Sequence, residues 1–278
     1  MENFEHLGLL IRFGDKESKG TPLSQAAPFF ANSDPDMPAA PVPVAQVLNC
    51  HDSAIYILAP LRYATVYGCS DATIVLGAIG KTVRIEHCER VHIIVAAKRV
   101  CIANCRECML FLGVNQPPVI VGDNHKLQVA PYNTFYSQLE EHLAEVGIES
   151  NINRWDKHIT LGVVDPHDSL SHPAGVSDAQ AESAISLDPD LFTSFLIPNW
   201  FGEAHTGSTK ENPFPLPDAY LESQQRNKNN LEEIKQALGN ASLADTQKRE
   251  LSNALHVYFK DWLYASGNIR QLYCLQGD

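Results

Sequence analysis

Apolar residues recur along the middle of the chain with the spacing of stacked β-strand coils. Cys50, Cys69 and Cys88 are 19 residues apart, and Cys105 follows after a further 17. Asn124 takes the equivalent place 19 residues later. On either side of each of these markers the apolar positions alternate, which is the period of a β-strand. The pattern therefore predicts two short strands in each coil, joined by a turn at the marker.

Aligned on the markers, the coils form columns of apolar residues. The columns before the marker hold Ala45, Ala64, Val83, Val100 and Val119, and then Val47, Val66, Ile85, Ile102 and Val121. The columns after it hold Ser53, Ala72, Val91, Cys108 and Leu127; Ile55, Ile74, Ile93, Leu110 and Val129; and Ile57, Leu76, Val95, Leu112 and Pro131. One coil cannot bury its inner face alone, but coils stacked about 4.8 Å apart make a continuous core. The predicted fold is mainly β: a right-handed parallel β-helix of about five coils, with C-terminal α-helical elements.

The remaining sequence divides the chain into four regions. Residues 1–42 are expected to be a flexible Pro-rich segment and residues 43–133 the β-helix. Residues 134–212 are expected to hold a helix that ends at Gly147 and caps the open end of the coils, with packed loops behind it. Residues 213–278 are expected to form a helical hairpin, with helices at Asn230–Leu238 and Ser242–Ser266.

Composition and charge exclude several classes of partner. The chain of 278 residues has a formal net charge of −12 and no long basic run, which disfavours binding to nucleic acid. No apolar stretch approaches the roughly 20 residues of a membrane-spanning helix, and the N-terminal pattern does not fit a signal peptide. A cytosolic location is therefore expected. In that compartment the seven cysteines are expected to stay reduced.

The marker cysteines could suggest zinc, but stacking separates them along the coil axis. Cys50 and Cys105 would lie about three rung spacings apart, whereas one zinc ion needs every sulfur about 2.3 Å away. We therefore interpret Cys50, Cys69, Cys88, Cys105 and Asn124 as a structural ladder, and we expect neither a metal nor a cofactor. The stretch with Asp165, His167, Asp168 and His172 is interpreted as a solvated loop. The outward positions lack the paired acids of sugar-cleaving β-helix enzymes, which leaves such an enzyme a weak alternative.

The turns carry a family resemblance. Cys50-His51-Asp52, Cys69-Ser70-Asp71 and Cys105-Arg106-Glu107, with the closing Val129-Ala130-Pro131-Tyr132-Asn133, resemble the tubulin-binding cofactor C domain. Cyclase-associated protein shares this β-helix. Leu58-Ala59-Pro60-Leu61-Arg62 and the tail from Tyr258 to Leu272 are similar to a divergent member of the family.

The resemblance implies a GTPase-activating role toward tubulin, in which a Gln-Gln-Leu-Arg segment supplies an arginine finger. In this chain the aligned segment is Lys98-Arg99-Val100-Cys101, so that Cys101 occupies the finger position. A cysteine cannot supply the fixed cation that stabilises a transferring phosphoryl group. Arg99 on the same outward face and Arg84 one coil below are the nearest cations. The simpler interpretation of both is an exposed strand arginine without a catalytic role.

These observations predict a non-catalytic cytoskeletal adaptor. Divergent family members imply roles in microtubule organisation, organelle positioning and cell morphogenesis, in the cytoplasm at a microtubule-organising centre or spindle pole. The expected partner is a protein, either tubulin or another cytoskeletal protein, or a small GTPase. The candidate binding residues are Arg84, Lys98, Arg99, Cys101 and Arg62, and no catalytic residue is assigned. The alternative is a GTPase-activating protein that acts on tubulin or on a small GTPase.

Overall fold

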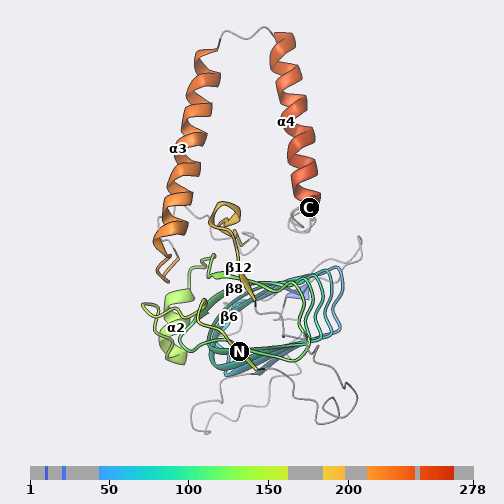
Figure 1. Ribbon diagram of the computed structural model, residues 1–278, viewed down its shortest axis with the longest axis vertical. Coiled ribbons are helices and arrows are strands. Elements are labelled where there is room, and N and C mark those ends of the chain that lie inside the picture. The colour runs from blue at the N-terminus through green and yellow to red at the C-terminus, as the bar shows by residue number, and fades with distance from the viewer. Residues whose placement is uncertain are drawn as a thin grey trace, which may run out of the picture. The chain divides into compact units, whose positions relative to one another are not determined.

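The computed structural model describes residues 10–11, 21–22, 44–161, 184–197, 212–241 and 245–265. Two compact units divide the chain: Met1–Leu187 with Ser194–Pro215, and Asp188–Thr193 with Leu216–Asp278. The first unit contains a solenoid of stacked β-strands and the second contains two long helices (Figure 1). Within the described part of the chain, no helix has the length and apolar character that crossing a membrane requires.

The solenoid has two parallel sheets that share the long strands β6 (Thr73–Glu86) and β7 (His92–Ala103). The strands that follow the markers pair in the order β4 (Ala54–Ile57), β6, β7, β8 (Met109–Val114), β10 (Gln128–Pro131) and β12 (Ile185–Ser186). The strands that precede the markers are β3 (Val44–Leu48), β5 (Tyr63–Tyr67), the second halves of β6 and β7, β9 (Val119–Val121) and β11 (Ile159–Leu161). The predicted parallel β-helix is confirmed, with about five coils. Its right-handed winding stays a prediction.

The register of the strands after the markers is the predicted one. Ile55 pairs with Ile74, Ile74 with Ile93, Ile93 with Leu110 and Leu110 with Val129. From Ile74 to Val129 the side chains of this column are fully buried. Burying large aliphatic side chains at about 1.5–3 kcal/mol each makes this stacked core the main source of stability.

The fifth coil departs from the predicted columns before the marker. Cys101 pairs with Val119 and Ile102 with Ile120, one residue away from the predicted register. Ile120 is therefore the buried residue, whereas Val119 and Val121 are half-buried on the outward side. The reason is an extra turn residue: Gly122 and Asp123 both lie between β9 and the marker Asn124, where earlier coils have one residue.

The helix α2 (Leu139–Val146) buries Leu139, His142 and Leu143 and ends at Gly147 in the left-handed conformation. The apolar face of α2 and its end at Gly147 were predicted from the sequence. The predicted location, over the open end of the coils, was wrong. The last residue of α2, Val146, lies against Gly80 in β6, on the flank of the coil stack rather than over its open end. Figure 1 shows α2 beside the coils. On the first coil, β1 (Leu10–Ile11) pairs with β4 and with β2 (Thr21–Pro22).

In the second unit, the 3₁₀ helix η4 (Pro189–Leu191) packs on α3 (Asp218–Asn240). The helix α3 begins twelve residues before the predicted start at Asn230, directly after Pro217. Tyr220 packs edge-on against Phe192, and the hydroxyl of Ser223 donates to Asp190 at 2.6 Å, which explains the earlier start. The helix α4 (Asp245–Ala265) falls within the predicted range. The described apolar residues Ile234 and Phe259 are exposed, so that packing of the two helices as a hairpin stays a prediction.

Candidate protein-binding face

The strands that precede the markers present one continuous set of outward side chains, called here the outer face. Alternation along each strand sends every second residue outward, and parallel pairing aligns these residues between coils. The outer face comprises Val44, Gln46, Leu48, Tyr63, Thr65, Tyr67, Thr82, Arg84, Glu86, Arg99, Cys101, Ala103, Val119, Val121, Ile159 and Leu161.

Much of the outer face is apolar and exposed. Tyr63 and Tyr67 are each 41% exposed, and Ile159 and Leu161 about half exposed. These apolar ends flank the polar centre that Arg84 and Arg99 form, and exposed apolar area on a protein surface typically marks a site of interaction with another protein. The sequence analysis did not assign a binding role to these residues, because its binding candidates were chosen around the basic residues. The signal was present as large apolar residues at the outward positions of the same alternating strands.

Arg84, Arg99 and Cys101 lie at the centre of the outer face, and the outward direction predicted for them agrees with the register, while their role in binding stays a prediction. Arg84 pairs with Cys101 on the next coil, and Arg99 pairs with Thr82. Arg84 forms an ion pair with Glu86, donating from Nε at 2.9 Å and from Nη2 at 2.5 Å to the same carboxylate oxygen. The role of Glu86 was missed, although its place two residues along the strand from Arg84 is visible in the sequence. Among the residues that the structure describes, Arg99 forms no ion pair.

The thiol of Cys101, which the family resemblance aligns with the arginine finger, is half-buried. Burial raises the pKa of Cys101 above its ordinary value, while the charges of Arg99 and Arg84 act in the opposite direction. The Cys101 side chain is therefore a neutral thiol near pH 7. It offers no cation to a phosphoryl group.

The other two predicted binding residues lie at the border of the outer face. Arg62 precedes β5, and its guanidinium lies 5.6 Å from the centre of the Tyr63 ring. Lys98 is half-buried in β7, and its carbonyl oxygen accepts from the amide of Gln116. Lys81 in β6 is a further exposed cation near them that the sequence reasoning did not single out.

The markers lie at a different corner of each coil, called here the turn corner, residues 49–52, 68–71, 87–90, 104–107 and 122–126. Two residues in each turn have positive φ: Asn49, Gly68, His87, Asn104 and Gly122 on one side, and Asp52, Asp71, Arg90, Glu107 and Lys126 on the other. This left-handed conformation is costly for most residues and favours Gly, Asn and Asp. It reverses the chain sharply between the two sheets.

The marker cysteines are reduced and buried from Cys69 to Cys105. Their thiols donate to backbone carbonyls two residues earlier, as from Cys105 to Ala103 at 3.3 Å. Hydrogen bonding to Cys108 and Cys88, together with burial, raises the pKa of Cys105. Asn124 closes the series by accepting from the Cys105 amide at 2.9 Å. The arrangement satisfies polar groups of the turn internally, and hydrogen bonds from Cys105 and Cys69 lower the pKa of the buried Cys88 thiol.

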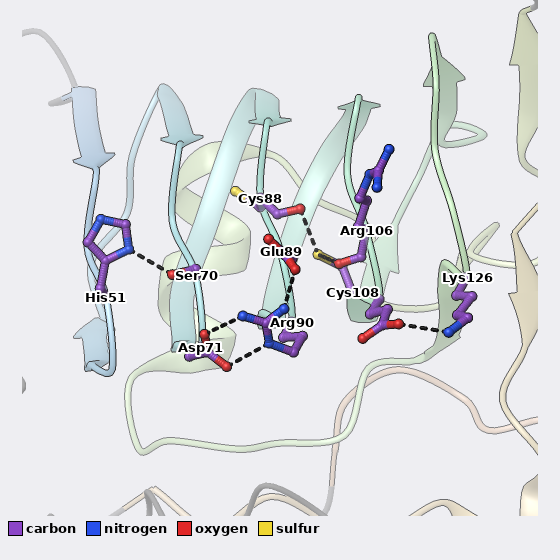
Figure 2. Close-up of polar contacts among 10 residues, drawn as sticks. His51, Ser70, Asp71, Cys88, Glu89, Arg90, Arg106, Cys108 and Lys126 are labelled. Carbon is purple, nitrogen blue, oxygen red and sulfur yellow. Dashed lines mark hydrogen bonds and ion pairs between the residues drawn. The ribbon is translucent and has the colours of Figure 1, made fainter.

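Exposed side chains at the turn corner form ion pairs with one another. Arg90 donates to Asp71 on the previous coil at 2.8 and 2.9 Å and also contacts Glu89. Lys126 donates to Glu107 at 2.7 Å, which lowers the pKa of that carboxyl. Figure 2 shows these contacts running from coil to coil.

The described residues hold no cluster of three or more histidine, cysteine or acidic side chains that could bind a metal. The histidine-rich stretch of residues 165–172 lies outside the described residues.

Comparisons with known proteins find a family match that covers the coils. Residues 44–159 match the family model of tubulin binding cofactor C. TBCC domain-containing protein 1 of Xenopus tropicalis is 29% identical over 229 residues, which cover 82% of this chain and 38% of the relative. The mouse and human proteins of the same name are 27% and 26% identical, over 80% and 82% of this chain and 37% and 38% of their own length.

This chain thus spans less than two fifths of the length of those curated relatives. The matched residues 44–159 contain the strands from β3 to β10 and every residue of the outer face except Leu161. The resemblance carried by the cysteine turns is confirmed: the coil region is similar to the tubulin binding cofactor C domain.

Proposed function

We propose that this chain is a non-catalytic cytoskeletal adaptor whose outer face binds a tubulin-related protein. The observation that carries the proposal is a sheet face with exposed apolar side chains at both ends and a neutral thiol at the finger position, beside Arg99, which has no ion pair among the described residues. An adaptor needs complementary contact area, which an apolar face with a few arginines supplies. An activator needs a cation placed at the finger position, which Cys101 does not supply.

The proposal extends to a cellular role. The adaptor would act in the cytoplasm at a microtubule-organising centre or spindle pole, in organelle positioning and cell morphogenesis. The support is the likeness to TBCC domain-containing protein 1.

The proposal is tested by measuring the affinity of the full chain for purified tubulin and for a panel of small GTPases. We expect the double variant Arg84→Ala, Arg99→Ala to lose roughly 10- to 100-fold in affinity, because interface arginines are often binding hot spots. Arg106→Ala at the turn corner is the matched control and should bind like the wild type. Equal binding of all three proteins, or no binding to any of these partners, would refute the proposal.

GTPase activation is the second candidate, because Arg84 occupies the position next to Cys101 on the neighbouring coil. A partner docked one coil lower would meet Arg84 in place of the family's arginine. The wild-type chain should leave GTP hydrolysis at background if the adaptor proposal is right. A rise of about 10³-fold or more that disappears in Arg84→Ala or Arg99→Ala would establish the activator instead. Cys101→Arg tests whether restoring the finger creates activity.

A further inference from the structure

The Arg84–Glu86 pair has a geometry that prepares the arginine to bind a second anion. A guanidinium carries five N–H donors in a planar fork. Glu86 accepts from Nε and Nη2 with a single oxygen, along one side of that fork. By this count three donors remain, including both on Nη1. The end of the fork, which suits the two oxygens of a carboxylate or phosphate, is left open.

Burial places the two partners at different depths. The Glu86 side chain is 23% exposed, whereas the Arg84 side chain is 63% exposed. The carboxylate therefore lies low on the outer face and the guanidinium stands above it. An exposed arginine normally samples many rotamers, and fixing it by a low-lying acid reduces the entropy lost when a ligand binds.

A second arginine, Arg99, lies on the neighbouring coil, diagonally across from Arg84. Arg84 neighbours Cys101 across the coils, and Arg99 lies two residues before Cys101 on the same strand. Both arginines lie near enough to the Cys101 thiol for their charges to affect it. Among the described residues, only Glu86 of the acids is ion-paired with either arginine. One carboxylate against two guanidinium groups leaves a net positive charge at this spot on an acidic protein.

We propose that Arg84 and Arg99 form a binding site for one oxyanion group of the partner, over Cys101, and that Glu86 positions Arg84 for it. The ligand is a carboxylate or a phosphate. This inference rests on the proposed function, because it assigns a ligand chemistry to the face that would contact the partner. In this inference Glu86 helps anion binding because it holds the guanidinium of Arg84 in place. Its negative charge alone would repel the anion and weaken binding.

Cys101 offers a direct measurement in the whole 278-residue chain. An oxyanion held by the two arginines covers the half-buried thiol, so that it should slow alkylation of Cys101 by the neutral reagent iodoacetamide. The rate at Cys101 is followed by mass spectrometry of the peptide while inorganic phosphate or acetate is added at constant ionic strength. Cys50, half-buried at the turn corner, is the internal control and should react at a constant rate. Protection of Cys101 gives an apparent dissociation constant.

Two substitutions separate positioning from charge. Glu86→Gln and Glu86→Ala both remove the negative charge, but only the glutamine can still accept from Nε and Nη2 of Arg84. We expect Glu86→Ala to bind the anion roughly 3- to 10-fold more weakly than Glu86→Gln, the loss of one oriented contact to a charged group. Glu107→Gln and Glu107→Ala at the turn corner are the matched control pair, and neither should change protection of Cys101.

Each outcome decides the inference. Protection by acetate and by a glutamate-containing peptide would support a carboxylate of the partner, and protection by phosphate alone would support a phosphate source. Absence of protection by either ion, or equal affinity of Glu86→Gln and Glu86→Ala, would overturn it. Such a result would leave the adaptor proposal standing if tubulin still binds. Conversely, anion binding without any capture of tubulin or small GTPases would refute the adaptor proposal alone.

Discussion

The turn corner and the outer face are built by the same repeat, yet they treat charge in opposite ways. At the turn corner, acids and bases of neighbouring coils pair with each other, as Asp71 does with Arg90 and Glu107 with Lys126. On the outer face, Arg99 has no ion pair among the described residues, and the coils at both ends of the face carry large exposed apolar side chains, such as Tyr63 and Ile159. The repeat fixes where side chains lie, while the choice of side chain decides whether they serve the fold or a partner.

Stacking explains why the turn corner must satisfy its own charges. Neighbouring coils lie about 4.8 Å apart, so that like charges at equivalent positions would repel each other. The column Asp52, Asp71, Arg90, Glu107 and Lys126 avoids a long run of one sign. On the outer face the same spacing brings Arg84 and Arg99 onto neighbouring coils, and among the described residues Glu86 is the one acid ion-paired with either of them. That imbalance is tolerated in water and becomes useful when a partner supplies the missing anion.

The largest expected effect comes from the core that both regions share. Ile93→Asp should unfold the solenoid, because a carboxylate in the central column has no route to water and costs several kcal/mol. Ile74→Asp should do the same. Circular dichroism and thermal melting would show loss of the cooperative transition, and binding to tubulin should disappear with it. Ile93→Val, which keeps the column apolar, is the control. A soluble and cooperatively folding Ile93→Asp variant would contradict the core assignment.

A smaller effect is expected from Gly68→Ala at the turn corner. Gly68 has a φ of +65°, and an added Cβ would lie 2.3 Å from the Oδ1 atom of Asn49. Strain at such a position typically costs about 1–3 kcal/mol, which should appear as a lower midpoint in urea unfolding. Gly239→Ala in α3 is the control, because an added Cβ there would meet no atom within 4 Å. If Gly68→Ala is as stable as the wild type, the left-handed turn is not a constraint on this fold.

The columns after the markers were predictable because side-chain volume and period both repeat there without interruption. The register of β9, the strand that precedes the marker Asn124 in the fifth coil, was not predictable. Counting back from Asn124 does not reveal that the turn of this coil has one residue more than the earlier turns. The start of α3 was missed for a related reason. Residues 218–229 are polar and show no apolar stripe, and their helix is held by contacts with the distant Phe192 and Asp190.

The sequence predicted which residues of these strands point outward, but it did not predict how their side chains are arranged. Alternation placed Arg84, Arg99 and Cys101 outward, and register placed Arg84 beside Cys101. The direction of the Arg84 side chain depends on a rotamer choice between Glu86 and its other neighbours, which a pattern of residue types does not encode. The difference between a cluster of cations and an oriented site therefore emerged only from the side-chain geometry.

A third prediction concerns pH. Burial lowers the pKa of His142 below its ordinary value, while Glu145 and Glu141 partly oppose the shift. The folded state therefore prefers the neutral imidazole, which accepts from or donates to the Tyr136 hydroxyl at 3.1 Å. The ordinary pKa of histidine is about 6.5, and at a pH above this value the imidazole is neutral in both the folded and the unfolded state. His142 then adds no pH dependence to the free energy of unfolding. Below that pKa value the unfolded state takes up the proton first, so that stability falls.

Urea unfolding at pH 7.5 and at pH 5.5 would measure this change. His142→Gln keeps a hydrogen-bonding group and removes the titration, so that it should lose less stability between the two pH values than the wild type. We expect the difference to be smaller than the effect of Gly68→Ala, because α2 lies on the flank of the coils. An identical loss in both proteins would show that other groups control the acid response.

The smallest expected effect is at the ion pairs of the turn corner. Asp71→Asn removes the charge that pairs with Arg90, but the Arg90 side chain is 45% exposed and Asp71 25% exposed, and ion pairs open to water contribute little to stability. Arg90 also keeps its contact with Glu89. We therefore expect the melting temperature to fall barely at low salt and not at all at high salt, where screening removes the difference.

Arg99→Ala on the outer face should likewise leave the melting temperature unchanged while it weakens tubulin binding. The two variants together test the comparison, because the turn corner should affect only the fold and the outer face only the partner. Weaker tubulin binding by Asp71→Asn, or a clear loss of stability in Arg99→Ala, would show that the two regions are not separate in function.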